Sequence, residues 1–378
     1  MTHKWLLFGI LIFFLFSCDQ AKNKTISTEE LAGIATEIPT ENIEIKSEND
    51  TLTPREISII GVGDIMLGSN YPSKKLLPHN DTNILSHLSE ELQNADLTFG
   101  NLEGTIFDHG GIAKNCVNPE NCYVFRTPSK YGKYLADAGF DVMSIANNHS
   151  GDFGTEGRKK TKENLTSLGI KFAGLLDSDE SAIFEKDGVT YGFSAFAPNK
   201  GTVDINNLQR ARELISELKK KVNIVIVSFH GGAEGDNFQH IPQKNEIYFG
   251  ENRGNVYEFS HAVIDAGADL VFGHGPHVTR ALELYKGKFI AYSLGNFATY
   301  GNFSLSGSKG IAPIVKVILN EKGDFVEGSI ISTFQKKNSG PKIDPENRAL
   351  QKVINLTKTD FPQSLLKISA DGKITIKE

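Results

Sequence analysis

The clearest pattern along the chain is an apolar run that stops abruptly at polar residues. Val142–Ala146 is followed at once by Asn147-Asn148-His149, and Asp152 comes three residues later. Buried strands are near-continuous apolar runs, and ligands in open α/β sheets bind outside the carboxyl ends of strands. The pattern therefore predicts a strand that delivers side chains to a site. Taken alone, the same residues are equally typical of an Asn/Gly turn.

Five further apolar runs end in carboxylate, amide or imidazole groups. These groups are Asp64 after 57–63, Asn101 with Glu103 after 96–99, His230 after 222–229, His274 with His277 after 268–272, and Asn296 after 288–293. A single Asp at such a place is more often a helix cap, and a single His can be a core or surface residue. Because the groups recur at successive strand ends, the sequence favours one metal or catalytic cluster.

Helical patterns alternate with the predicted strands. We expect helices near 83–94, 128–138, 155–168, 206–221, 256–266 and 345–356. A hairpin turn at Asp187-Gly188 is expected to join two strands. The polar, aperiodic residues 235–254 predict a surface insertion near the mouth of the site. The alternation predicts an α/β fold, and the strand-rich C-terminal half predicts a second sheet packed on the first.

The N-terminal residues predict export. Lys4 precedes the apolar run Trp5–Phe16, which has signal-peptide length and is too short to span a bilayer. The run ends in Leu15-Phe16-Ser17-Cys18, which resembles a bacterial lipobox. We favour a lipoprotein acylated at Cys18 and facing the periplasm or cell surface over a plain secretory signal. Residues 19–56 are polar and without period, as in a flexible tether.

Composition limits the partners and the chemistry. A formal net charge of −6 provides no basic surface, which argues against nucleic acid as the main partner. Besides Cys18, the chain has only Cys116 and Cys122. In an exported protein this pair favours a disulfide over a metal site, because no second Cys pair exists to complete a thiolate site.

The ligand candidates contain no cysteine. Imidazole together with carboxylate and amide oxygens suits Mn²⁺, Zn²⁺, Fe or Mg²⁺. A set this large predicts two divalent ions, which would activate a bridging water and hold a phosphoryl group or a similar oxyanion.

Seven short motifs follow one another along the chain: Gly63-Asp64-Ile65-Met66-Leu67, Asn101-Leu102-Glu103-Gly104, Phe125-Arg126-Thr127-Pro128, Ala146-Asn147-Asn148-His149, Gly267-Ala268-Asp269, Gly273-His274-Gly275-Pro276-His277-Val278 and Tyr292-Ser293-Leu294-Gly295-Asn296-Phe297. In this order they resemble the CapA family of poly-γ-glutamate capsule synthesis proteins. The resemblance implies a calcineurin-like metallophosphatase fold with two packed mixed β-sheets flanked by helices in four layers, α/β/β/α. We expect this domain to span 57–335, with 336–378 as a C-terminal extension packed on it.

The resemblance also implies roles for individual residues. The metal-ligand positions are matched by Asp64, Glu103, Asn148, His230, His274 and His277. His149 matches a general acid, and Asp152 is placed to fix its tautomer. Arg126 is a candidate anchor for an anionic substrate, with a surface ion pair as the alternative. Asn296 is the second candidate for substrate binding.

Four positions depart from the pattern of related proteins. Met66 stands where classical metallophosphatases have a His ligand, and Asn101 belongs to a motif where those enzymes have a second carboxylate. Gly231 and Gly275 replace a Trp and a His that CapA members often carry. One metal site is therefore expected to be weaker or differently filled.

The leading hypothesis is an exported metal-dependent hydrolase of poly-γ-glutamate capsule biosynthesis. Metal-bound hydroxide would attack a phosphoester or an amide bond of an anionic polymer or phosphoester substrate, and His149 would protonate the leaving group. The alternative is a non-catalytic accessory subunit that binds the polymer or the capsule synthase through the same cleft.

Overall fold

The computed structural model describes residues 55–115, 122–301 and 303–377. The expected signal peptide with Cys18, all but the last two residues of the tether, and Cys116 lie outside this part of the chain. Lipidation, the tether and the Cys116–Cys122 disulfide therefore stay predictions. None of the helices in the described part is both long enough and apolar enough to cross a bilayer.

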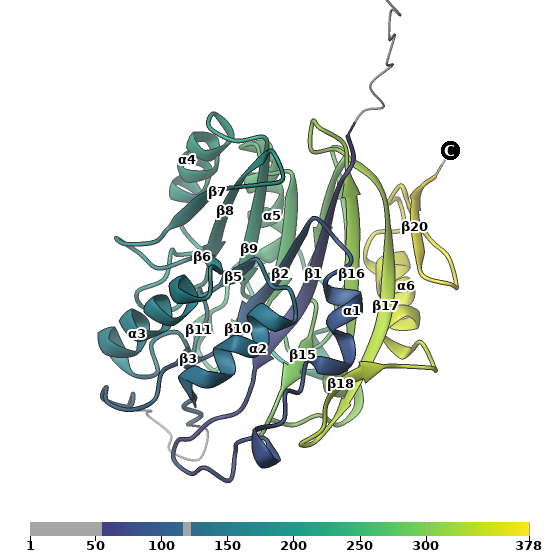
Figure 1. Cartoon of the computed structure of the whole chain (residues 1–378). Coiled ribbons are helices and arrows are strands. Elements are labelled where there is room, and N and C mark those ends of the chain that lie inside the picture. The colour runs from purple at the N-terminus through teal and green to yellow at the C-terminus, as the bar shows by residue number, and fades with distance from the viewer. Residues whose placement is uncertain (1–54, 116–121, 302, 378) are drawn as a thin grey trace, which may run out of the picture. The chain divides into compact units, whose positions relative to one another are not determined.

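Two β-sheets form the centre of the fold (Figure 1). The larger sheet contains β1 (Ile57–Met66), β2 (Leu97–Leu102), β5 (Val142–Ser144), β6 (Lys171–Ala173), β15 (Asn296–Thr299), β16 (Ile311–Leu319), β17 (Phe325–Lys336), β18 (Gly340–Ile343), β19 (Leu366–Ile368) and β20 (Lys373–Ile376). The smaller sheet contains β7 (Ser181–Lys186), β8 (Val189–Phe196), β9 (Ile224–His230), β12 (Leu270–His274), β13 (Leu282–Tyr285) and β14 (Lys288–Ala291).

Each sheet has a parallel centre. The order is β19-β20-β17-β16-β1-β2-β5-β6 in the larger sheet, with β15 beside β1, and β13-β14-β12-β9-β8-β7 in the smaller one. The pairs β1/β2, β2/β5, β8/β9 and β9/β12 are parallel. Parallel strands end at the same edge of a sheet, so the residues that follow β1, β2 and β5 are neighbours, as are those that follow β9 and β12.

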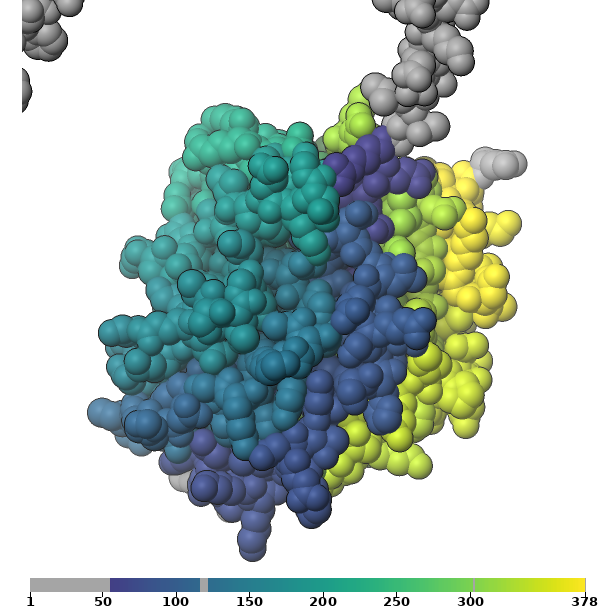
Figure 2. Space-filling model, viewed as in Figure 1, coloured from purple at the N-terminus to yellow at the C-terminus, as the bar shows by residue number. Residues whose placement is uncertain are grey.

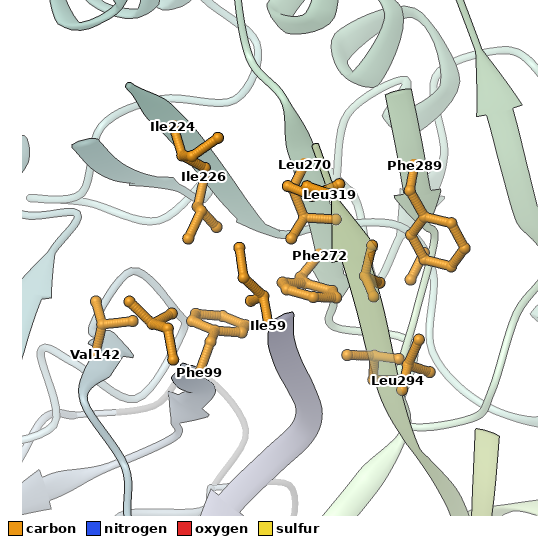
Figure 3. Close-up of a cluster of buried hydrophobic side chains, with 14 of the residues drawn as sticks. Ile59, Phe99, Val142, Ile224, Ile226, Leu270, Phe272, Phe289, Leu294 and Leu319 are labelled. Carbon is orange, nitrogen blue, oxygen red and sulfur yellow. The ribbon is translucent and has the colours of Figure 1, made fainter. Parts of the chain in front are cut away.

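Apolar side chains from both sheets form the core between them (Figure 3). Phe99 of β2 and Phe272 of β12 stack across the interface, with ring centroids 5.3 Å apart and planes 4° apart. Gly61 of β1 makes room for this pair, because a Cβ there would lie 2.4 Å from the Phe272 ring. The two sheets therefore approach closely near the edge where the polar residues gather.

Helices cover the outer face of each sheet. α1 (Ser89–Leu92), α2 (Gly132–Asp137) and α3 (Gly154–Ser167) bury Leu92, Leu135 and Leu165 against the larger sheet. α4 (Leu208–Lys219) and α5 (Val256–Asp265) bury Ile215 and Phe259 against the smaller sheet. The predicted fold class, two packed mixed sheets flanked by helices in four layers, is confirmed.

The C-terminal residues lie along one side of the molecule (Figure 2). α6 (Arg348–Asp360) contacts β16 and β17, and β19 and β20 extend the larger sheet at its edge. The helix begins three residues later than expected, after Asp344, whose carboxylate accepts hydrogen bonds from the Arg348 backbone (3.0 Å) and side chain (2.9 Å).

The prediction of a continuous helix over 83–94 is wrong. Only Ser89–Leu92 is α-helical, and 3₁₀ turns precede it. Leu85, Leu88 and Leu92 are nevertheless buried, as the apolar pattern predicts. Ser86 donates its hydroxyl to the Asn83 carbonyl at 2.9 Å, a local contact that competes with continuous helix.

We predict that Phe272→Ala lowers the free energy of unfolding by about 3–5 kcal/mol, because the cavity would open between two closely packed sheets. Ile183→Ala is the matched control, since Ile183 in β7 is 51% exposed. Chemical denaturation followed by circular dichroism measures both values. Equal, small losses in the two variants would contradict the described inter-sheet packing.

Candidate metal centre

Asp64 lies where the two sheets meet. The preceding residue, Gly63, has no room for a side chain, because a Cβ there would lie 2.0 Å from the Gly295 carbonyl oxygen. The Asp64 carboxylate is fully buried and accepts hydrogen bonds from His274 Nδ1 (3.2 Å) and His277 Nδ1 (2.9 Å). Burial raises the pKa of Asp64, but these hydrogen bonds outweigh burial and hold it below its usual range.

Glu103 forms the second half of the cluster. Its Oε1 lies 3.4 Å from His230 Nε2 and 3.6 Å from His277 Nε2. Ligand atoms of Glu103, His230 and His277 all lie within 4.8 Å of one another. His277 reaches this place with a φ of 58°, an unusual backbone conformation for a residue other than glycine. Its imidazole thereby bridges the carboxylates of Asp64 and Glu103.

Burial and charge shift the pKa values of this cluster in different directions. Burial raises the pKa of Glu103 to about 7 and lowers the pKa of His230 to about 3. His230 is therefore a neutral imidazole at neutral pH. Burial also lowers the pKa of His277, but Glu103 and Asp64 outweigh it and raise the value to about 10. Metal binding through His277 Nε2 would have to release a proton.

Several buried polar atoms here have no hydrogen-bond partner among the described residues. They are both carboxylate oxygens of Glu103, both ring nitrogens of His230, Nε2 of His274, and the amide oxygens of Asn148 and Asn296. Leaving buried polar groups unpaired is costly. Nitrogen and oxygen donors without thiolate suit Zn²⁺, Mn²⁺ or Fe. The residues present therefore fit a divalent metal centre.

Two asparagines hold the cluster in place. Asn101 donates from Nδ2 to Asp64 Oδ1 (2.8 Å), and its Oδ1 accepts from Asn147 Nδ2 (3.1 Å). Asn147 also accepts a hydrogen bond from the backbone N–H of His149 (3.1 Å). Met66 is buried, and its sulfur accepts from the Gly68 backbone at 3.2 Å.

His149 and Asp152 form a hydrogen-bonded pair beside the cluster. His149 Nδ1 lies 2.9 Å from Asp152 Oδ2, which also accepts from the Phe125 backbone N–H at 2.7 Å. Lys114 Nζ contacts the other oxygen, Asp152 Oδ1, at 2.6 Å. A carboxylate that accepts from Nδ1 leaves Nε2 of the ring for other contacts.

A cleft of about 400 Å³ opens over this edge of the sheets. Its lining includes the predicted site residues Asn148, His149, His277 and Asn296, together with Glu234. The aromatic and cationic residues of the lining are Tyr123, Phe125, Tyr248, Phe249, Phe303, Lys114, Arg253 and Lys309. They lie in loops and short elements without a periodic signal, and apart from Phe125, which belongs to a quoted motif, the sequence did not single out these side chains.

Arg126 does not line this cleft. Its Nε donates to Asn70 Oδ1 at 2.7 Å and its Nη1 to the Gly110 carbonyl at 3.2 Å. The guanidinium also lies 5.0 Å from the centre of the Phe153 ring. These contacts assign Arg126 to loop packing, and the cations that face the cleft are Lys114, Arg253 and Lys309.

The second predicted substrate-binding residue, Asn296, does line the cleft. It begins β15 and lies opposite Asp64 in the register of β1 and β15. Its Nδ2 donates to the Lys309 carbonyl at 3.2 Å, while its Oδ1 has no partner in the described part of the chain.

Comparison with known proteins confirms the motif resemblance. The model of the family "Bacterial capsule synthesis protein PGA_cap" matches residues 58–300. The chain is 32% identical over 252 residues to the PGA biosynthesis protein CapA of Bacillus subtilis, covering 62% of this chain and 61% of that protein. It is 28% identical over 351 residues to the capsule biosynthesis protein CapA of Bacillus anthracis, covering 87% and 78%.

Among solved structures, the chain is similar to a 5'-nucleotidase precursor from Thermus thermophilus. The TM-score is 0.40 at 12% identity, over 81% of this chain and 59% of that chain.

We predict that His230→Ala weakens Zn²⁺ binding by about 100-fold or more, since the side chain offers two unpaired nitrogens to the cluster. The control is His87→Ala, because His87 is exposed in a 3₁₀ turn. Isothermal titration calorimetry measures both affinities, and circular dichroism checks that both variants fold. Unchanged Zn²⁺ affinity in His230→Ala would rule out this metal centre.

Proposed function

We propose that this chain, which belongs to the bacterial capsule synthesis protein family PGA_cap, is a metal-dependent phosphoesterase of capsule biosynthesis. The observation that carries the proposal is the cluster of Glu103, His230 and His277, in which Glu103 and His230 have buried ligand atoms without hydrogen-bond partners and His277 lines the cleft. His149 stands beside this cluster with Asp152 behind it. Metal ligands next to an oriented imidazole are the components of metal-assisted hydrolysis.

The metal would be held by Glu103, His230 and His277, with Asp64, His274 and Asn148 completing the expected ligand set. A divalent ion in such a site supplies an activated water and polarises the phosphoryl oxygen.

His149 gives up a proton to the leaving oxygen in this proposal. Asp152 fixes the ring by accepting from Nδ1, so His149 acts as the acid in its imidazolium form, giving the Nε2 proton to the leaving oxygen and becoming the neutral ring with Nδ1–H. Lys114, Arg253 and Lys309 attract the anionic substrate into the cleft. Asn101 and Asn147 connect the Asp64 carboxylate to the backbone of His149 through a chain of hydrogen bonds.

A non-catalytic accessory subunit remains the second candidate. Two departures from classical metallophosphatases favour it: Met66 is buried with its sulfur bonded to the Gly68 backbone, and Asn101 is bonded to Asp64 and Asn147. Such a subunit would bind an anionic polymer or a synthase component in the same cleft. It would also bind metal, so only turnover separates the two candidates.

We predict that His149→Ala lowers kcat by about 10²–10⁴-fold for an alkyl phosphoester, whose leaving group needs a proton. The loss should be much smaller for p-nitrophenyl phosphate, because p-nitrophenolate leaves without protonation. Steady-state kinetics with Mn²⁺ or Zn²⁺ measures both, with His87→Ala as control. Equal losses on the two substrates would contradict a proton-donor role.

The same assay separates the two candidate functions. Wild-type protein without activity on phosphomonoesters, phosphodiesters or γ-glutamyl amides would overturn the enzyme proposal and favour the accessory subunit. Hydrolysis of the γ-glutamyl amide alone would replace the phosphoesterase with an amidase at the same centre.

We also propose that the protein is exported and anchored through a lipid on Cys18, because a signal-like apolar run ends in a lipobox-like sequence. Cys18→Ser should move the protein from the membrane fraction to the soluble exported fraction and abolish incorporation of labelled palmitate. Cell fractionation with immunoblotting measures this. Membrane retention without label in the wild type would argue against lipidation.

A further inference from the structure

We propose that the mouth of the cleft is a stacking subsite for a planar ring, so that the substrate is a ring-bearing phosphoester such as a nucleoside monophosphate. This inference rests on the proposed phosphoesterase function for the location of the scissile bond. Its other support is a group of aromatic and cationic side chains that line the cleft and that the metal chemistry does not use.

The first part of the subsite is a short hairpin inside the insertion 235–254. β10 (Ile247–Tyr248) and β11 (Glu251–Asn252) pair around a turn formed by Phe249 and Gly250. Both turn residues have positive φ, 48° and 81°. Such turns favour Asn-Gly, and a bulky residue with positive φ is a conformational outlier.

Packing does not offset the backbone strain at Phe249. Its side chain is 81% exposed and lines the cleft. It contacts the Tyr248 ring at a centroid distance of 4.4 Å. Strained residues that persist without a packing benefit point to function. An exposed aromatic pair at the mouth of a polar cleft is suited to receive a flat ring.

A second aromatic wall leads from the mouth to the proton donor. Phe303 and Phe125 stack with centroids 5.1 Å apart and planes 20° apart. Phe125 in turn lies 4.4 Å from the imidazole of His149. Both phenylalanines line the same cleft as Tyr248 and Phe249. A ring bound among these side chains is within the cleft that contains His149.

Arg253 places a buried guanidinium next to the hairpin, where it could bind an anion. The residue is 6% exposed and lines the cleft, and its guanidinium pairs with two carboxylates, Nε with Glu251 Oε2 at 2.9 Å and Nη2 with Glu234 Oε1 at 3.3 Å. Its Nη1 is buried with no hydrogen-bond partner in the part of the chain that is described. Its guanidinium lies 5.7 Å from the centre of the Tyr248 ring. A buried guanidinium with a free donor suits a phosphate oxygen.

The base of the hairpin is rigid, which preorganises the subsite. The Arg253 and Glu246 backbones pair at 2.8 Å, and the Glu246 carboxylate accepts two hydrogen bonds from the buried Arg280, at 2.8 Å and 2.7 Å. Glu246 also accepts from the backbone N–H of Ala233, which follows the ligand loop at His230. The hairpin is therefore connected through Glu246 to the segment that follows His230.

These features select a ligand class. Base stacking on aromatic side chains is favourable for any nucleobase, and Arg253 and Lys309 provide positive charge for a phosphate. An acyclic γ-glutamyl chain would use the cations and leave the aromatic side chains unused. A nucleoside monophosphate uses both.

The test measures binding without turnover, using the full-length protein with EDTA. Isothermal titration calorimetry compares AMP, ribose 5-phosphate, adenosine and tetra-γ-glutamate. AMP should bind at least tenfold more tightly than ribose 5-phosphate. Phe249→Ser should remove this difference and leave ribose 5-phosphate unchanged, while Ile183→Ser, an exposed apolar residue on β7, should change neither affinity.

The variant Arg253→Met tests the phosphate contact separately from the stacking of the ring on the aromatic side chains. It should weaken AMP and ribose 5-phosphate about equally and leave adenosine unchanged, and circular dichroism verifies its fold. The inference would be overturned if AMP and ribose 5-phosphate bound equally, or if neither bound. It would also be overturned if Phe249→Ser left the AMP affinity unchanged, or if tetra-γ-glutamate bound more tightly than AMP. AMP binding without hydrolysis of any phosphoester in Mn²⁺ would overturn only the proposed function.

Discussion

The carboxylate of Asp64 is the contact on which the site depends. It comes from β1 in the larger sheet and accepts hydrogen bonds from His274 at the end of β12 in the smaller sheet, from His277 in the loop that follows β12, and from Asn101 of its own sheet. These bonds are formed in full burial, where an ionised carboxylate without partners would be unstable. These hydrogen bonds link the two sheets at the edge where the loops that carry the candidate ligands meet.

The electrostatic character of the centre follows from this arrangement. His277 lies between two carboxylates that raise its pKa, whereas His230 is kept neutral by burial. A divalent cation would replace the positive charge that His277 carries between Asp64 and Glu103, and it would bind ligand atoms that have no hydrogen-bond partner among the described residues. The residues of the cluster therefore fit a divalent cation.

Much of the fold was predictable because its signals are local. Apolar runs marked β1, β9 and β12, and Asp187-Gly188 marked the β7–β8 hairpin, where both residues have positive φ. The helix expected at 83–94 failed because burial of its leucines does not require continuous helix. Tertiary packing decided that segment, and a periodic pattern could not reveal the competing serine contacts.

Some residues of the site were likewise predictable from the sequence, and others were not. Strand ends predicted which side chains gather at this edge, since parallel topology brings such ends together. Arg126 was chosen for its chemistry, but only the three-dimensional structure shows its guanidinium occupied by Asn70 and Gly110. Arg253 and Phe249 lie in a polar, aperiodic insertion, where no pattern indicates which side chains face the cleft.

The central claim is that the strand ends of two sheets form one metal centre. Anomalous X-ray diffraction from crystals grown with Zn²⁺ tests it most directly. We expect an anomalous peak with protein ligand distances of about 2.0–2.2 Å to Glu103, His230 and His277. Anomalous density absent from this cluster at saturating Zn²⁺, or present only at surface residues, would contradict it.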